Sequence, residues 1–372
     1  MRDGYKTRPV TVGHVRLGGD SPVRVQGMAK ADTRDVPMVS RQLQEMTELG
    51  CEIARVAVPD QEAVEALAQL KRQVTIPLVA DIHFDYRLAL AAIQAGADKL
   101  RINPGNIGDT ERVQAIVEAA RQRRIPIRIG VNAGSLEKHL LLEHGGPRPE
   151  ALVESALGHC RLLTDEGFED IVLSVKSSSV TDTIAAYRSL AHRTVFPLHL
   201  GVTEAGTLVR GTVKSAVGMG VLLSEGIGDT LRISLAASPA DEIRIAYHIL
   251  SALNLRRRGV EVVACPTCGR CEIDIRPIAQ EVEKRLSHVT EPLTVAVMGC
   301  PVNGPGEAKH ADVGIACSRS GALLFVRGKV IDTVDREDMV QALLRQVNDL
   351  LAKPSMKEGI ICGGNSNHSG IQ

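Results

Sequence analysis

Residues 77–103 read PLVADIHFDYRLALAAIQAGADKLRIN, and this stretch decides the fold. A short apolar run, Pro77–Ile82, is followed by an amphipathic pattern over Arg87–Gly96 and by a second apolar run, Lys99–Asn103. Short apolar runs predict buried strands, and apolar residues at helical spacing predict the helix between them. A strand, a helix and a strand in this order predict two parallel strands joined by a crossover helix.

The same unit recurs from about residue 20 to residue 255. The predicted strands are Val23–Gly27, Ile53–Val58, Pro77–Ile82, Lys99–Asn103, Pro126–Val131, Asp170–Val175, Pro197–Val202 and Thr230–Leu235. Helical patterns separate most of them, such as Met38–Leu49, Thr110–Arg123 and Ala151–Glu166. Eight strands in roughly 250 residues predict an α/β fold of the TIM (β/α)8 barrel type. An open doubly wound sheet is the competing fold, and it is disfavoured because no strand is followed by a G-x-G-x-x-G loop.

Polar side chains recur near the carboxyl ends of these strands at a period of two. They are Arg55, Asp81, His83, Arg101, Asn103, Arg128, Asn132, Ser174, Lys176, His199, Thr203, Arg232 and Ser234. Residues of one parity point to one side of a strand, so in a closed barrel this set converges at the mouth, where barrel enzymes carry their active sites. Any single charge among them is also compatible with a structural ion pair or a solvated strand end.

Five of these residues are cations that come from five different strands. They are Arg55, Arg101, Arg128, Lys176 and Arg232. Such a group predicts binding of a dense anion such as a diphosphate, because guanidinium groups bind phosphate oxygens in pairs. Nearby glycines would let backbone N–H groups approach the same anion. These glycines are Gly105, Gly130, Gly134 and Gly201.

Carboxylates and histidines beside this cationic group are candidates for proton transfer. Glu204, in the run GVTEAG over residues 201–206, and Asp81 are each suited to acid–base work during loss of a hydroxyl group. His83 and His199 are equally compatible with catalysis and with satisfied histidines of the core.

A cysteine-rich run near the C-terminal third indicates a metal centre. Residues 265–271 read CPTCGRC, and residues 299–307 read GCPVNGPGE. Three soft sulfurs and one more replaceable carboxylate oxygen suit an iron–sulfur cluster that stays reactive at one corner. A structural zinc module is the alternative, and its ligands would be Cys265, Cys268, Cys271 and Cys300.

Composition narrows the possible functions. The chain has 372 residues, a formal net charge of zero, four Tyr, four Phe and no Trp, which argues against a nucleic-acid binding surface. The N-terminal residues lack the apolar region of a signal peptide, and we expect a cytoplasmic protein. The expected domains are a barrel over residues 1–255, a smaller α+β iron–sulfur domain over 256–352 and a disordered tail over 353–372.

The order of these domains has a geometric consequence. In a TIM barrel each helix runs back from the mouth to the base, so the last helix, Pro239–Leu253, would deliver the chain to the base. A cluster that must meet a ligand at the mouth would then start at the wrong end of its own barrel. We therefore expect a head-to-tail homodimer in which each cluster domain caps the barrel of its partner.

Seven motifs together resemble the family of 4-hydroxy-3-methylbut-2-enyl diphosphate synthases of the non-mevalonate isoprenoid pathway. The motifs are ADIHF (80–84), LRINPGN (100–106), RIGVNAGSL (128–136), SVKSS (174–178), LGVTEAG (200–206), CPTCGR (265–270) and GCPVNGPGE (299–307). The resemblance covers residues from about 8 to 350 and implies reduction of 2-C-methyl-D-erythritol 2,4-cyclodiphosphate by two electrons, with ring opening and loss of a hydroxyl group as water.

The same resemblance implies the cofactor and the electron donor. A [4Fe–4S] cluster would be held by Cys265, Cys268, Cys300 and Glu307, and flavodoxin or ferredoxin would supply electrons. Asn303 lies on the cluster turn and would hydrogen-bond the ligand.

Two departures from the family pattern leave a divergent paralogue as the alternative. The family usually has Gln-Ser-Met-Thr-Asn-Thr after the first strand, whereas residues 26–32 here read QGMAKAD, with Lys30 gained. Cys271 stands where threonine is more usual, either as a competing ligand or as an inert neighbour.

Overall fold

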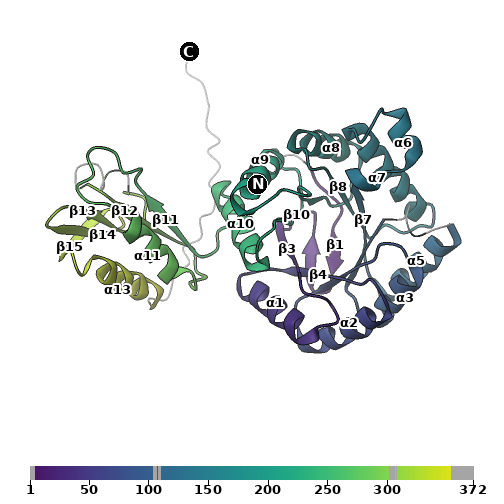
Figure 1. Ribbon diagram of the computed structural model, residues 1–372, viewed down its shortest axis with the longest axis horizontal. Helices are drawn as coiled ribbons and strands as arrows, with labels where there is room; N and C mark the ends of the chain where they lie inside the picture. The colour runs from purple at the N-terminus through teal and green to yellow at the C-terminus, as the bar shows by residue number, and fades with distance from the viewer. Residues whose placement is uncertain (1–4, 104–106, 108–109, 301–305, 307, 353–372) are drawn as a thin grey trace, which may run out of the picture. The chain divides into compact units, whose positions relative to one another are not determined.

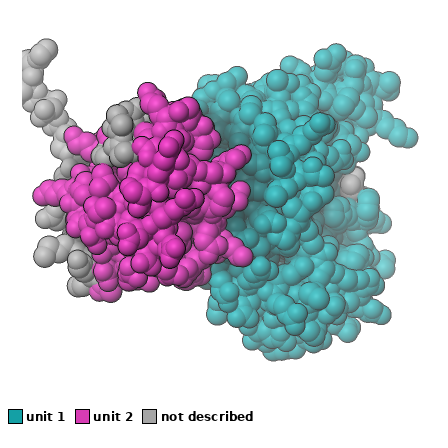
Figure 2. Space-filling model, turned by 60° about the vertical axis from the view of Figure 1, so that its left-hand side comes forward, with its two compact units in different colours: residues 1–257 teal, residues 258–372 magenta. Residues whose placement is uncertain are grey.

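The chain divides into two compact units, Met1–Arg257 and Arg258–Gln372 (Figures 1 and 2). The computed structural model describes residues 5–103, 107, 110–300, 306 and 308–352. Asn303, Glu307, Gly105 and the expected tail over 353–372 lie outside the described residues. The division falls two residues after the boundary expected from the sequence.

Eight parallel strands form the centre of the first unit. They are β3 (Arg24–Met28), β4 (Ile53–Ala57), β5 (Leu78–Asp81), β6 (Lys99–Ile102), β7 (Ile127–Asn132), β8 (Ile171–Lys176), β9 (His199–Leu200) and β10 (Thr230–Leu231). Their order in the sheet is β8-β7-β6-β5-β4-β3-β10-β9. A parallel bridge between Leu173 of β8 and Leu198, next to β9, brings the two edges together. The predicted TIM barrel is confirmed.

Helices surround this barrel (Figure 1). They are α1 (Val36–Glu48), α2 (Gln61–Gln73), α3 (Tyr86–Gln94), α5 (Thr110–Arg123), α6 (Lys138–Glu143), α7 (Pro149–Thr164), α8 (Val180–Arg193), α9 (Leu208–Ser224) and α10 (Pro239–Ala252), with a short 3-10 turn, η1 (Ala133–Ser135), before α6. Several begin where an Asp or Ser side chain accepts a hydrogen bond from a backbone N–H of the first turn, as Asp60 does from Ala63. These caps lie in the loops that follow the strands, so they define the mouth of the barrel.

Alternation along the strands separates the two sides of the barrel wall. On β6, Leu100 and Ile102 belong to the apolar core shared with the helices, whereas Lys99 and Arg101, which alternate with them, are buried polar residues. Ile127 and Ile129 flank Arg128 on β7 in the same way. The apolar parity therefore packs against helices, and the polar parity fills the interior of the barrel.

A hairpin closes the base of the barrel. Strands β1 (Val10–Val12) and β2 (Val15–Leu17) pair antiparallel, and their four apolar side chains share a cluster with Ile53, Val79 and Val172 from the amino-terminal parts of three barrel strands. The sequence analysis did not predict this hairpin, because each strand has only three residues and lies outside the repeating unit.

The last two barrel strands are shorter than predicted. Strand β9 begins at His199, although the pattern predicted Pro197, and β10 ends at Leu231, although the pattern predicted Leu235. The reason for the second difference is visible in the hydrogen bonding: the backbone N–H of Leu235 is donated to the side chain of Glu242 on α10, not to a neighbouring strand.

Among its described residues, the second unit has a five-stranded sheet and the helices α11 (Arg276–Leu286) and α13 (Met339–Ala352). The strands are β11 (Val260–Ala264), β12 (Leu293–Met298), β13 (Val313–Cys317), β14 (Gly321–Val326) and β15 (Lys329–Asp335). β11, β12 and β13 run parallel, and β14 and β15 continue the sheet antiparallel. This is the expected α+β domain, with β15 as one edge strand of its sheet. Among the described residues of both units, no helix is long and apolar enough to cross a membrane.

Candidate active site

A polar cavity of about 110 Å³ lies at the carboxyl ends of the barrel strands. The residues that line it are Arg55, Asp81, His83, Arg101, Arg128, Gly130, Asn132, Ser174, Lys176, Thr203, Arg232 and Ser234. These residues come from seven of the eight strands or from the loops that directly follow them. Eleven of the thirteen polar residues of the period-two pattern line this one cavity, whereas Asn103 and His199 do not.

Asp81 organises one wall of the cavity. Its carboxylate accepts a hydrogen bond from Arg101 Nη1 at 3.1 Å, and its second oxygen lies 3.7 Å from Arg55 Nε. Arg55 also donates from Nε and Nη2 to the sulfur of Met28, at 3.0 and 2.9 Å. Asp81 is only 3% exposed, so this carboxylate is sealed between two guanidinium groups.

The charges of this wall determine the protonation of Asp81. Burial alone would raise the pKa of the carboxyl group, but Arg55 and Arg101 outweigh burial and lower the pKa of Asp81 to about 2. Burial lowers the pKa of Arg55 to about 10, against the attraction of Asp81. Both groups are charged at neutral pH, so Asp81 holds the two arginines and is a poor proton donor.

His83 sits at the rim of the cavity as a neutral ring. Arg101 Nη1 lies 2.8 Å from His83 Nε2, and because a guanidinium can only donate, Nε2 is the acceptor and the ring proton is on Nδ1. Burial, reinforced by the positive charge of Arg101 and Arg55, lowers the pKa of His83 even though Asp81 opposes this shift. His83 can therefore offer one N–H donor to a ligand.

The remaining cations have few negative partners. Arg128 and Lys176 are 2% and 7% exposed, and burial together with neighbouring cations lowers the pKa of both well below the usual values. The Nε of Arg128 has no hydrogen-bond partner among the described residues. Arg232 Nη2 lies 3.6 Å from Glu242 Oε2. The cavity therefore carries an excess of buried positive charge, which a bound anion would neutralise.

Two further polar groups lie in the barrel interior but do not line the cavity. Lys99 and His199 are fully buried, and the Lys99 amine and both ring nitrogens of His199 have no hydrogen-bond partner among the described residues. Burial, reinforced by neighbouring cations, lowers the pKa of each well below its usual value. His199 is thus a core histidine that the structure does not bring to the ligand surface.

Glycines make room for two of the cations. A Cβ placed on Gly130 would lie 2.8 Å from Arg101 Nε, and one placed on Gly201 would lie 2.5 Å from Lys176 Nζ. From the sequence, we expected these glycines to bring backbone N–H groups to an anion. In the structure they instead leave space for charged side chains, whereas a Cβ on Gly134 would meet nothing within 4 Å.

Two predicted site residues do not line the cavity. Glu204 is exposed and has φ +50°, a left-handed conformation that is uncommon for a residue with a side chain. It directly follows Thr203, which does line the cavity. Asn103 is 4% exposed and follows β6. Ser174 and Thr203, which the period-two pattern contained, do line the cavity.

Cys265, Cys268, Cys271 and Cys300 of the second unit lie near one end of its sheet strands. Cys265 follows β11 and Cys300 follows β12, and these neighbouring strands are parallel, so both thiols lie at the same end. The backbone N–H of Gly299 lies 3.3 Å from Cys265 Sγ. Cys268 is exposed, and hydrogen bonds from the backbone and side chain of Arg270 lower the pKa of its thiol. Three thiols that are exposed or half-buried at one end of the sheet, one of them a stabilised thiolate at Cys268, fit a thiolate-bound metal cluster.

Cys271 lies beside this group. Its sulfur is 3.7 Å from Cys265 Sγ, and desolvation followed by the hydrogen bond to Cys265 raises the pKa of the Cys271 thiol to about 11. A Cβ on Gly299 would lie 2.4 Å from Cys271 Sγ, so this glycine gives the extra thiol its place. Among the described residues, these four cysteines do not form a group of three ligand atoms close enough to hold one ion, as a preformed zinc site would require.

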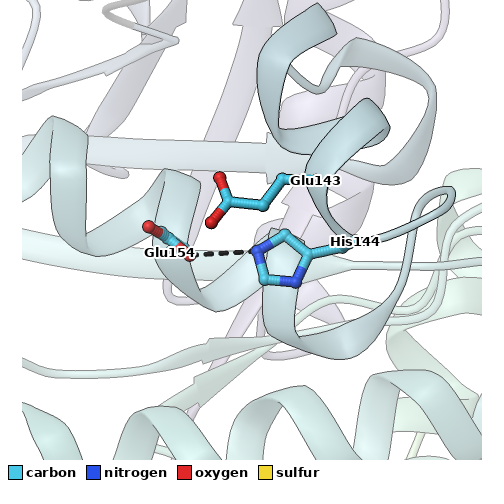
Figure 3. Close-up of side chains that lie close together, drawn as sticks. All are labelled: Glu143, His144 and Glu154. Carbon is cyan, nitrogen blue, oxygen red and sulfur yellow. Dashed lines mark hydrogen bonds and ion pairs between the residues drawn. The ribbon is translucent and has the colours of Figure 1, made fainter.

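One such group occurs elsewhere, on the outside of the barrel. Glu143 and His144, at the end of α6, face Glu154 on α7, and Figure 3 shows His144 directed at the Glu154 carboxylate. His144 Nε2 lies 3.0 Å from Glu154 Oε2, and both carboxylates are exposed. This ion pair accounts for the arrangement without a metal.

Comparison with known proteins gives matches over both units. Residues 7–247 match the GcpE TIM-barrel domain, and residues 261–349 match the GcpE protein C-terminal domain. A 4-hydroxy-3-methylbut-2-en-1-yl diphosphate synthase (flavodoxin) of Geobacter sulfurreducens is 56% identical over 94% of this chain and 99% of its own length. The protein of the same name from Lawsonia intracellularis is 54% identical over 94% of this chain and 97% of its own length.

Proposed function

The chain belongs to the GcpE family of 4-hydroxy-3-methylbut-2-en-1-yl diphosphate synthases, and from this premise we propose how its residues carry out the family's reaction. It is an enzyme that converts 2-C-methyl-D-erythritol 2,4-cyclodiphosphate to 4-hydroxy-3-methylbut-2-enyl diphosphate. The substrate gains two electrons, its ring opens at a carbon–oxygen bond to phosphate, and one hydroxyl group leaves as water. The printed names of the relatives include flavodoxin, and we propose flavodoxin or ferredoxin as the donor here.

The cavity binds the cyclic diphosphate through its excess of positive charge. Arg128 and Lys176 are buried and Arg232 is half-buried, and burial lowers the pKa of all three, so an anion with two charges would favour their charged forms as it binds. Arg101 and Arg55 are held in place by Asp81 before the ligand arrives, so their ordering adds little cost at the moment of binding. Asn132, Ser174, Thr203 and Ser234 supply neutral donors for the hydroxyl and phosphate oxygens.

Proton delivery involves residues at the rim. We assign the acid role to Glu204, because Asp81 stays ionised and Glu204 directly follows the cavity-lining Thr203. His83 would orient a substrate oxygen with its Nδ1–H. Both residues are at the mouth, where the leaving oxygen needs its proton.

A [4Fe–4S] cluster would be held by Cys265, Cys268 and Cys300, with Glu307, outside the described residues, as the fourth ligand. The cluster would pass single electrons and act as a Lewis acid toward a substrate oxygen. The protonated Cys271 thiol would remain a neighbour that donates a hydrogen bond to Cys265. Asn303, also outside the described residues, would hydrogen-bond the ligand.

A head-to-tail homodimer would bring the cluster to the substrate. The structure adds one observation to the topological reasoning: Arg256, just after α10, donates to the carbonyl of Val23 and to Glu52, which precede β3 and β4 at the base of the barrel. The chain thus leaves the barrel at the end opposite the cavity. A cluster domain contributed by a second subunit at the mouth is the simplest solution.

The single observation that carries the proposal is the cation-lined cavity at the barrel mouth. The test is an anaerobic assay of the reconstituted holoenzyme with the cyclic diphosphate and reduced flavodoxin or dithionite. Lys176→Met should raise KM by about ten- to hundredfold, which is the range for a lost charge-assisted hydrogen bond. Lys138 is exposed, so Lys138→Met serves as the control and should have the KM of the wild type. A fully loaded cluster without formation of the allylic diphosphate would favour the divergent-paralogue alternative.

The dimer is tested by mixing two impaired variants at a substrate concentration at which neither alone shows activity above background. Lys176→Met impairs the barrel and Cys265→Ser impairs the cluster site. If the cluster and the barrel of one active site come from different subunits, exchange of native subunits in the mixture should form mixed dimers. Each mixed dimer should have one intact site, so part of the activity should return. Activity that stays absent in the mixture, although native mass spectrometry detects mixed dimers, would contradict the shared site.

A further inference from the structure

Lys30 connects the first barrel strand to the last one. It follows β3 by two residues, and its Nζ donates to the carbonyl oxygen of Leu235 at 2.7 Å and to that of Ala237. The same Nζ lies 2.9 Å from Glu242 Oε1 on α10. Lys30 does not line the cavity. Its side chain is therefore committed to the loop after β10 and to a buried carboxylate.

Glu242 lies between this lysine and the cavity. It is only 1% exposed, and its Oε1 accepts a hydrogen bond from the backbone N–H of Leu235 at 2.8 Å. Its Oε2 has no hydrogen-bond partner among the described residues and lies 3.6 Å from Arg232 Nη2. A buried carboxylate requires a compensating cation. Lys30 and Arg232 share this role, and Arg232 is the one that lines the cavity.

The loop that Lys30 holds is also part of the site. Ser234 lines the cavity and directly precedes Leu235, whose N–H is bound by Glu242 and whose carbonyl is bound by Lys30. Both polar backbone atoms of this residue are thus tied to the same ion pair. The Lys30–Glu242 ion pair therefore affects both the position of Ser234 and the direction of the Arg232 side chain.

We propose that Lys30 is a positioning residue for the substrate diphosphate. By neutralising Glu242, it leaves the Arg232 guanidinium available to the ligand, and by binding the carbonyls of Leu235 and Ala237 it fixes Ser234 at the cavity wall. This inference rests on the proposed binding of the diphosphate in the barrel cavity. Lys30 thereby acts at the site although it does not touch the substrate.

Removal of the Lys30 charge should redirect Arg232. Without the ammonium group, Glu242 keeps Arg232 as its nearest cation, and the attraction in a buried site favours that ion pair over the bound ligand. The loss should therefore appear in substrate binding and not in the chemical step. If Glu242→Gln is added, no carboxylate competes for Arg232, and the amide oxygen of the introduced glutamine can still accept the N–H of Leu235.

The test compares Lys30→Met, Glu242→Gln and the double variant as anaerobic holoenzymes with equal cluster absorbance. Lys30→Met should raise KM for the cyclic diphosphate, and the Kd of inorganic diphosphate measured by calorimetry, by about tenfold, with kcat changed less than about threefold. The double variant should return KM to within about threefold of the wild type. Lys30→Gln, which keeps a donor but lacks the charge, repeats the comparison if Lys30→Met does not fold.

Two outcomes would overturn the inference. A lower Tm with unchanged KM in Lys30→Met would make Lys30 a purely structural residue. A double variant whose KM is at or above that of Lys30→Met would show that Glu242 does not compete with the ligand for Arg232. Lys176→Met separates these outcomes from failure of the proposed site. If Lys176→Met raises KM and Lys30→Met does not, only the role of Lys30 is wrong, whereas unchanged KM in both variants would refute the diphosphate site itself.

Discussion

Replacement of Asp81 by asparagine tests whether one carboxylate stabilises the cationic wall of the barrel. The pKa of Asp81 is lowered from 3.8 to about 2, although burial opposes this shift, because Arg55 and Arg101 lie beside it. Each pKa unit corresponds to about 1.4 kcal/mol, so the ionised carboxylate stabilises the folded state by about 2.5 kcal/mol at neutral pH. For a unit of this size, that loss lowers Tm by about 5–10 °C.

The pH dependence of this effect has a definite sign. The folded-state pKa lies below the unfolded-state value, so the stabilisation is fully present above pH 3.8 and is lost as the pH falls through about 2. The difference in Tm between the wild type and Asp81→Asn should therefore stay constant between about pH 5 and 8. Calorimetry of the anaerobic holoenzyme at one scan rate measures it.

A matched control is available in the same unit. The pKa of Asp32 is also lowered to about 2, first by the side-chain hydrogen bond from Arg34, but Asp32 is exposed. Asp32→Asn should change Tm much less than Asp81→Asn does, because water screens an exposed ion pair. A shift below about 2 °C for Asp81→Asn at neutral pH, or equal shifts for the two variants, would refute the assignment of Asp81 to the wall.

Two further predictions concern the barrel interior. Lys99→Met should raise Tm, because it removes a buried amine that has no hydrogen-bond partner among the described residues. Since the pKa of Lys99 in the folded state lies below the usual 10.5, the stability of the wild type should rise with pH, and this rise should be smaller in the variant. A lower Tm of the variant would show that the amine has a stabilising role. Gly201→Ala should raise KM by about tenfold, because the new Cβ would lie 2.5 Å from Lys176 Nζ and would displace the amine. Gly134→Ala is the control and should leave KM unchanged, because its Cβ meets nothing within 4 Å. Equal KM values of the two variants in initial-rate assays would contradict this reasoning.

Local sequence patterns predicted most of the barrel and much of its site. The period of two placed Arg55, Arg101 and Arg128 on the inner side of their strands, and the parallel strand order brought them to one end. The same pattern did not predict how far each side chain lies from the mouth of the barrel. His199 shares the parity of the site residues, yet it is fully buried and does not line the cavity, because depth depends on where each strand starts relative to its neighbours.

Contacts between distant segments could not be predicted. The sequence marked Lys30 as a departure from the family pattern, but its partners Leu235, Ala237 and Glu242 lie more than 200 residues away. Only closure of the barrel, which places β3 beside β10, brings them together. The hairpin of β1 and β2 was missed for a related reason: its apolar residues complete a surface formed by three other strands.

Among the described residues, that hairpin closes the end of the barrel opposite the cavity. Because Val10, Val12, Val15 and Leu17 seal the base with apolar packing, the proposed substrate and its product would both pass through the mouth, in opposite directions. Any second subunit that covers this opening during electron transfer must therefore withdraw once in every turnover. The rate of that withdrawal sets an upper limit on how fast the enzyme can cycle.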